Sequence, residues 1–307
     1  MGFARSVLLK ASRSQWLARQ LRERRFFQKA ARRFMPGEAL DDALDAAGQF
    51  AKAGMGSVLT ELGEQVTSRA EAAQVRDHYL GVLDKIQRRK LPAHVSIKLT
   101  HLGLEGSREG CVQDVLKLAA RADQARSFLW IDMEESRYVD ATLDVYRRAK
   151  AEWPNVGVCL QAYLRRTPAD LESLLSLSPA IRLVKGAYNE PADVAFPKKR
   201  DVDAAYFQLA QRLLGEAGRQ RVKPVFGTHD LSMIERIRQN AVAQKVAPSS
   251  CEFHMLYGIR AAEQRALASH GAEVRVLISY GSAWFAWYMR RLAERPANVW
   301  FVLRNVV

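Results

Sequence analysis

The chain has 307 residues, of which 48% are hydrophobic and 26% are charged, which is ordinary for a globular protein and excludes collagen-like, mucin-like and wholly disordered chains. Its formal net charge of +14 predicts contact with anionic surfaces or ligands. No apolar run approaches the roughly 20 residues that a membrane-spanning helix needs, which argues against an integral membrane protein.

The first 34 residues form a basic arm with ten Lys or Arg residues, one acid, Glu23, and interleaved Leu, Trp and Phe. We expect a helical arm that packs on the protein body, docks peripherally on an anionic membrane or binds nucleic acid, the last being least favoured. The first 20 residues also fit a transit peptide loosely, and residues 1–6 fit a myristoylation pattern. We assign residues 1–45 to the arm and residues 46–307 to a catalytic domain.

From residue 55 onward, short β-branched runs alternate with longer segments of helical periodicity. The eight runs are residues 57–61, 95–100, 128–133, 156–162, 181–185, 224–228, 252–256 and 274–278. Eight such βα units predict an α/β fold, a (βα)8 TIM-like barrel. An open doubly wound sheet is the alternative, but no GxGxxG motif follows a strand.

Two helix starts are marked between these runs. Residues 68–71 (SRAE) predict a capping box, and residues 167–170 (TPAD) predict a Thr167 cap, a proline at the first helical position and an acid in the first turn.

Polar residues gather where the predicted strands end. They are Glu61, Lys98, Asp132, Glu134, Glu135, Gln161, Lys185, Thr228 and His229. Because strand C-termini meet at one face of a (βα)8 barrel, these groups predict a functional site there.

The final helix, predicted over residues 284–295, places Trp287, Arg290, Arg291 and Glu294 on one face. Two arginines beside an acid predict a clamp for a small carboxylate, and a surface ion pair is the alternative.

The three cysteines, Cys111, Cys159 and Cys251, lie far apart and form no CxxC pair. Neither a disulfide framework nor a zinc site is predicted, and no HExxH spacing suggests another metal. A reducing, cytoplasmic compartment fits this cysteine usage.

Seven motifs resemble the proline dehydrogenase family in family order. They are HVSIKLTHLGL (94–104), IDMEE (131–135), QAY (161–163), IRLVKGAY (181–188), GTHD (227–230), CEFHMLYGIR (251–260) and YMRRLAERPAN (288–298). The short length resembles the monofunctional bacterial members, so the resemblance implies that a separate pyrroline-5-carboxylate dehydrogenase acts downstream.

The resemblance implies an FAD-dependent barrel that oxidises L-proline to Δ1-pyrroline-5-carboxylate by hydride transfer to flavin N5 and passes the electrons to a membrane quinone. The implied catalytic residues are Arg182, Lys98 and Asp132. The implied substrate site comprises Lys98, Arg290, Arg291, Glu294, Leu256, Leu277 and Trp287. The implied FAD site comprises Gln161, Arg182, Val184, Lys185, Gly186, Ala187, Tyr188, Thr228, His229 and His254.

The sequence departs from the family pattern at four positions. Leu277 and Trp287 stand where the family has tyrosine, His254 stands where glutamine is usual, and Ser279 replaces a common proline. These changes favour a second interpretation, a flavin-dependent dehydrogenase of a substituted or resized cyclic amino acid such as hydroxyproline or pipecolate. A non-enzymatic barrel that binds membranes or nucleic acid is the third interpretation.

Overall fold

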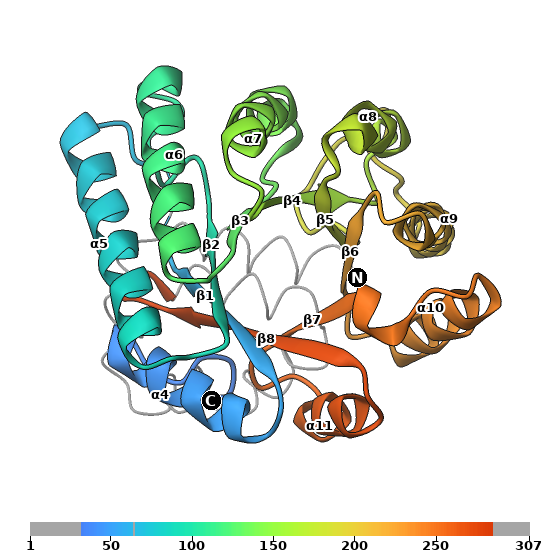
Figure 1. Cartoon of the computed structure of the whole chain (residues 1–307). Helices are drawn as coiled ribbons and strands as arrows, with labels where there is room; N and C mark the ends of the chain where they lie inside the picture. Colours follow the sequence, from blue (N-terminus) through green and yellow to red (C-terminus); the bar gives the residue numbers. More distant parts are fainter. Residues whose placement is uncertain (1–31, 64, 285–307) are drawn as a thin grey trace, which may run out of the picture.

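The structure, a computed structural model, describes residues 32–63 and 65–284. In this part of the chain eight parallel strands close into a barrel in sequence order (Figure 1). The strands are β1 (Gly56–Glu61), β2 (Ala93–Ile97), β3 (Leu129–Ile131), β4 (Val156–Gln161), β5 (Ala180–Val184), β6 (Lys223–Gly227), β7 (Glu252–Leu256) and β8 (Glu273–Tyr280). The predicted (βα)8 barrel is confirmed, and the doubly wound alternative is wrong.

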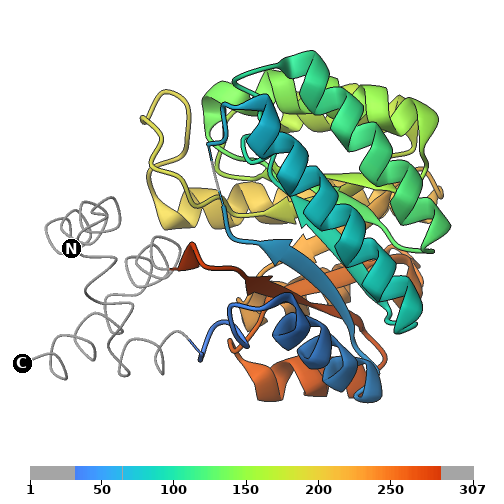
Figure 2. The same ribbon diagram turned by 90° about the vertical axis from the view of Figure 1, so that its left-hand side faces the viewer.

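Helices alternate with the strands and surround the barrel (Figure 1). They are α5 (Arg69–Arg88), α6 (Arg108–Gln124), α7 (Val139–Glu152), α8 (Thr167–Leu174), α9 (Lys199–Gly218), α10 (Leu231–Ala243) and α11 (Ala261–Ser269). The connections between strands and helices contain three short 3-10 helices: η1 (Ser136–Tyr138), η2 (Leu175–Leu177) and η3 (Pro248–Ser250). In the side view, α5 and α6 lie next to each other along the barrel wall (Figure 2).

One further helix, α4 (Leu40–Lys52), precedes the first strand and packs against β1 and β8. Its Ala43, Leu44 and Ala47 are fully buried against the barrel. The expected division between residues 45 and 46 falls inside this helix. Residues 1–31 of the basic arm lie outside the described residues, so the form and the partners of the arm stay predictions.

Two strands end two or three residues earlier than the sequence pattern predicts. Strand β2 stops at Ile97 because the chain turns directly after it, with Leu102 N donating to the Lys98 and Leu99 carbonyls, and β3 stops at Ile131. The polar residues expected at these strand ends therefore occupy loops at the barrel mouth.

One of the two predicted helix starts is confirmed in part, because the structure shows the Ser68 cap, which is one half of the predicted capping box. Ser68 accepts a hydrogen bond from Glu71 N and caps α5. The prediction for Thr167 is wrong: α8 already includes it, and its hydroxyl donates to the Gln161 carbonyl at 2.6 Å. That buried bond occupies the side chain, so Thr167 cannot cap the helix.

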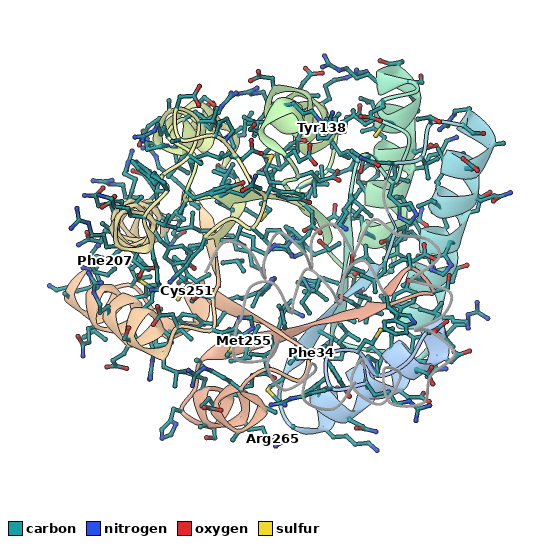
Figure 3. The ribbon with its side chains drawn as sticks, turned by 180° about the vertical axis from the view of Figure 1, so that it is seen from behind. Phe34, Tyr138, Phe207, Cys251, Met255 and Arg265 are labelled. Carbon is teal, nitrogen blue, oxygen red and sulfur yellow. The ribbon has the colours of Figure 1, made fainter. Side chains whose placement is uncertain are left out.

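The strands separate two apolar layers. Outward-facing residues such as Leu59, Val95 and Ile278 pack beneath the helices, whereas Trp130, with Val58 and other residues, forms a small cluster inside the barrel. In Figure 3 the labelled Met255 of β7 lies nearer the barrel than Phe207 and Arg265, which lie on the surrounding helices.

Throughout residues 32–63 and 65–284, each helix is too short or too polar to cross a bilayer.

Candidate functional site

A buried arginine side chain, that of Arg182, lies in the barrel interior. Arg182 of β5 is 3% exposed; its Nη2 donates to Ser96 Oγ of β2 at 2.9 Å and forms an ion pair with Asp132. Ser96 Oγ also donates to Asp132 Oδ1 at 2.9 Å. These contacts cross the barrel, so the guanidinium points inward, where its Cζ lies 5.2 Å from the Trp130 ring centroid.

A second polar cluster lies at the start of β7. Buried Glu252 is within 3.1 Å of His254 Nε2, within 3.1 Å of Arg275 Nε and 2.8 Å from Lys223 Nζ. Burial alone would raise the pKa of Glu252, but the bond to His254 and the charges on Arg275 and Lys223 together hold the pKa well below its usual range. Glu252 is therefore an ionised carboxylate inside the protein.

Three inward-facing polar atoms have no hydrogen-bond partner among the described residues: Gln161 Oε1, Arg182 Nη1 and His254 Nδ1. Strand register pairs Cys159 with Arg182 and Gln161 with Val184, so Gln161 shares the inner face. The Gln161 amide nitrogen is held by the carbonyls of Met133 and Glu134, at 3.1 and 3.2 Å, which leaves its oxygen as the unpartnered atom. Because an unpaired buried polar atom costs about 1–3 kcal/mol, these three atoms offer hydrogen-bonding positions that a polar ligand or buried water would fill.

The exit of β5 brings the backbone close to its neighbours. Gly186 has φ +106°, and a Cβ there would overlap the ring of Tyr163. Val184 and Tyr188 are half-buried, and Ala187 is exposed. The positive φ and the close approach of the Tyr163 ring both require glycine at this position.

Lys185 lies apart from the inward-facing groups. Its ammonium contacts Asp203 Oδ1 of α9 at 2.5 Å and Asp230 Oδ2 at 3.0 Å. Burial would raise the pKa of Asp230, but Ser232 and Lys185 hold the pKa below its usual range. The structure thus places Lys185 in an ion-pair cluster that fixes the loops after β5 and β6.

The exit of β6 is tied to the end of β7. His229 Nε2 accepts a hydrogen bond from Leu256 N at 2.8 Å, and Thr228 Oγ1 accepts one from Asp230 N at 3.1 Å. Thr228 is buried, whereas His229 and Leu256 are half-buried. A cofactor residue and a substrate residue of the predicted site are therefore neighbours.

Of the predicted substrate residues, Lys98, Leu256 and Leu277 are described. Lys98 directly follows β2 and is half-buried. Leu277 lies on β8 and packs against the cluster of Val58 and Trp130. Trp287, Arg290, Arg291 and Glu294 lie outside the described residues, so the carboxylate clamp stays a prediction.

The polar residues predicted at the strand ends do not gather into one cluster. Glu134 accepts hydrogen bonds from Thr100 N at 3.0 Å and Thr100 Oγ1 at 2.6 Å, and so joins two loops. Glu61 lies 3.8 Å from His78 Nε2 of α5, and its burial raises its pKa, which His78 opposes.

The sequence prediction missed Ser96, Trp130 and Glu252 as members of the interior clusters. The alternation of side chains along a strand could have identified them. Each stands two residues before a predicted site residue: Ser96 before Lys98, Trp130 before Asp132 and Glu252 before His254. Residues two apart on a strand share a face, so the inward direction of one implies that of the other.

Comparisons with known proteins agree on one family. The sequence model named Proline dehydrogenase matches residues 43–304. Proline dehydrogenase 1 of Bacillus subtilis subsp. natto is 36% identical over 277 residues, 90% of each chain. Proline dehydrogenase of Deinococcus radiodurans is 34% identical over 310 residues, 99% of this chain and 98% of the relative.

A solved structure shows the same fold. Proline utilization A (PutA) from Bdellovibrio bacteriovorus, inactivated by N-propargylglycine, superposes with a TM-score of 0.83 at 23% identity. The alignment covers 94% of this chain but only 36% of that protein. With full-length relatives above 30% identity and a family match over most of its residues, the chain belongs to the proline dehydrogenase family.

Proposed function

We propose that this chain oxidises L-proline to Δ1-pyrroline-5-carboxylate with FAD bound inside the mouth of the barrel. One observation carries the proposal: in a chain 34–36% identical to proline dehydrogenases, Arg182 presents an unpartnered N–H inside the barrel. A fixed cation at this place can stabilise the negative charge that a reduced ring acquires.

The residues of the site fit a flavin. Its ring carries both carbonyl groups and an N–H, and the interior offers one unpartnered donor, Arg182 Nη1, and two unpartnered acceptors, Gln161 Oε1 and His254 Nδ1. Val184, Ala187, Tyr188, Thr228 and His229 complete the proposed FAD site, and Lys185 borders it through its ion pairs with Asp203 and Asp230.

When bound, the flavin supplies the hydride acceptor, and the protein supplies orientation and charge. Asp132 holds the Arg182 guanidinium through its ion pair. Lys98 and the arginine pair Arg290 and Arg291 bind the substrate carboxylate, Glu294 orients that pair, and Leu256, Leu277 and Trp287 enclose the ring. Solvent takes the amine proton, since the sequence shows no side chain that can be assigned as the base.

Anaerobic titration with proline tests this function. The purified chain should be yellow, and proline should bleach the flavin absorption, with a soluble quinone restoring it. A colourless chain that also fails to bind added FAD would overturn the proposal and favour a barrel that binds membranes or nucleic acid.

Leu277 favours a second candidate substrate, a substituted or resized cyclic amino acid. The half-buried leucine on the inner face of β8 carries no hydroxyl where the family often has a tyrosine. Steady-state kinetics with proline, hydroxyproline, pipecolate and azetidine carboxylate distinguish the two. If proline is used far better than every analogue, the second candidate is wrong; if it is right, Leu277→Tyr should raise proline efficiency.

We further propose a cytoplasmic enzyme that touches the inner membrane peripherally, where its quinone acceptor dissolves. A separate pyrroline-5-carboxylate dehydrogenase would consume the product, and nucleic acid is not an expected partner.

A further inference from the structure

The carboxylate of Glu252 lies beneath the proposed flavin site and belongs to none of the predicted site residues. It is 7% exposed and has three neighbours from three strands: His254 on β7, Lys223 on β6 and Arg275 on β8. Two of these neighbours, Lys223 and Arg275, carry basic side chains whose charges lower the pKa of Glu252 and so stabilise the ionised carboxylate. An ionised carboxylate only accepts hydrogen bonds.

His254 is the neighbour that connects Glu252 to the barrel interior. Its ring is 2% exposed and meets the Trp130 ring edge to face, with centroids 5.5 Å apart. Its Nε2 lies 3.1 Å from Glu252 Oε2, whereas its Nδ1 has no partner among the described residues. The two nitrogens therefore have different surroundings.

The groups around His254 favour a neutral ring. Arg182 on β5 and Arg275 on β8 repel a second proton, and Glu252 attracts one. His94 on β2 also interacts with His254. The Nδ1 atom of His94 accepts a hydrogen bond from Trp130 Nε1 at 3.3 Å. Burial lowers the pKa of His254 to about 4 although Glu252 opposes this shift. The ring thus carries one proton at neutral pH.

That proton has only one satisfactory position. Glu252 cannot donate, so a bond to it requires the proton on Nε2. Nδ1 is then a bare lone pair and can act only as an acceptor. Glutamine, usual at this position in the family, carries both a donor and an acceptor and could present either one after rotation.

We propose that Glu252 is a positioning residue that fixes the Nε2–H tautomer of His254, so that Nδ1 accepts a hydrogen bond from an N–H of the bound flavin ring. This inference rests on the proposed FAD function. It assigns opposite polarities to two interior residues: Arg182 donates and His254 accepts. Flavin affinity should then depend on Glu252 only while residue 254 is a histidine.

A double-mutant cycle tests the dependence. FAD dissociation constants and flavin midpoint potentials are measured for wild type, Glu252→Gln, His254→Gln and the double variant. In the histidine background, Glu252→Gln should weaken FAD binding about tenfold, because the glutamine amide can force the other tautomer. In the glutamine background the same change should have less than about a twofold effect. Equal losses in both backgrounds would show a merely structural role and overturn the inference.

A control separates this effect from the loss of any buried carboxylate. Glu216 of α9 is also buried and pairs with Arg212, Arg219 and Arg221 away from the barrel interior. Glu216→Gln should leave FAD affinity and potential unchanged; an equal loss in this variant would overturn the inference.

Histidine ¹⁵N NMR of the unmodified protein keeps the inference testable if a variant fails to fold. Two-bond correlations should show the proton of His254 on Nε2 at neutral pH, with and without FAD. A proton on Nδ1 would overturn the inference while leaving the proposed function intact. A chain that binds no FAD would overturn both.

Discussion

Charged side chains inside the barrel are tolerated because each lies beside an opposite charge. Arg182 pairs with Asp132, and Glu252 lies between Lys223 and Arg275. Removing one member of such a pair leaves an uncompensated buried charge, which costs more than the pair contributes. Conservative replacements are therefore the informative ones at these positions.

Replacing Arg182 by lysine should keep the charge but lose the fork of N–H donors. The lysine ammonium has a single nitrogen, so it cannot occupy both the Nη2 position, which contacts Ser96 and Asp132, and the Nη1 position. We expect kcat to fall by about 10–100-fold while FAD remains bound, as measured by steady-state kinetics and the flavin spectrum. The matched change Arg148→Lys, in an exposed pair with Glu109, should leave kcat unchanged. Wild-type kcat in Arg182→Lys would contradict the assigned role.

The pH dependence of stability should reveal the buried His254. Burial lowers its pKa from 6.5 to about 4, so the unfolded chain gains a proton near pH 6.5 and the folded chain only near pH 4. The free energy of unfolding should therefore decrease as the pH falls through this window, by up to about 3 kcal/mol. Urea unfolding of His254→Gln should show a flatter slope between pH 7 and pH 5. His94, whose pKa is also lowered, is present in both proteins, and identical slopes would exclude the assigned shift.

At the scale of elements, the segment after β5 connects several strand exits. Glu190 accepts from Ser136 N and Oγ at 2.7 and 2.6 Å, and Phe196 N donates to the Tyr163 carbonyl at 2.8 Å. The segment therefore joins the loops that follow β3 and β4. Gly186, at its start, sets the direction in which the chain leaves the barrel.

Gly186→Ala should destabilise the protein and weaken FAD binding. Its φ of +106° is strained for alanine, and the methyl group would overlap Tyr163. We expect a loss of about 2–4 kcal/mol in urea unfolding. Gly271→Ala is the matched control, because its φ is +78° with open space around the Cβ position, so only about 1 kcal/mol of backbone strain should appear. Equal losses would mean that the overlap with Tyr163 carries no cost.

At the scale of the whole molecule, positive charge is concentrated in one segment. Residues 1–34 contain ten basic residues and one acid, a net +9 of the total +14. The rest of the chain carries the difference, 14 − 9 = +5. Such an asymmetry favours contact with an anionic bilayer through the arm.

The full chain should bind anionic vesicles in a salt-sensitive way. Removing residues 1–34 should reduce this binding at least about tenfold, because each basic residue near the surface contributes attraction that salt screens. Co-sedimentation with phosphatidylserine vesicles measures it, with neutral phosphatidylcholine vesicles as the control. Equal binding by the shortened chain would exclude the arm as the docking element.

The sequence by itself determined the barrel, since the eight predicted β-branched runs overlap all eight strands. For β7 the predicted run and the strand have the same bounds, residues 252–256. It also determined the family, because linear motifs carry that information. Only the tertiary structure decided which polar groups meet. Lys185 faces Asp203 and Asp230 rather than the interior, whereas Glu252 lies beside His254 and two cations from other strands. Strand alternation fixes the face of a side chain, but its partners depend on register and closure of the barrel, which bring residues from distant segments together.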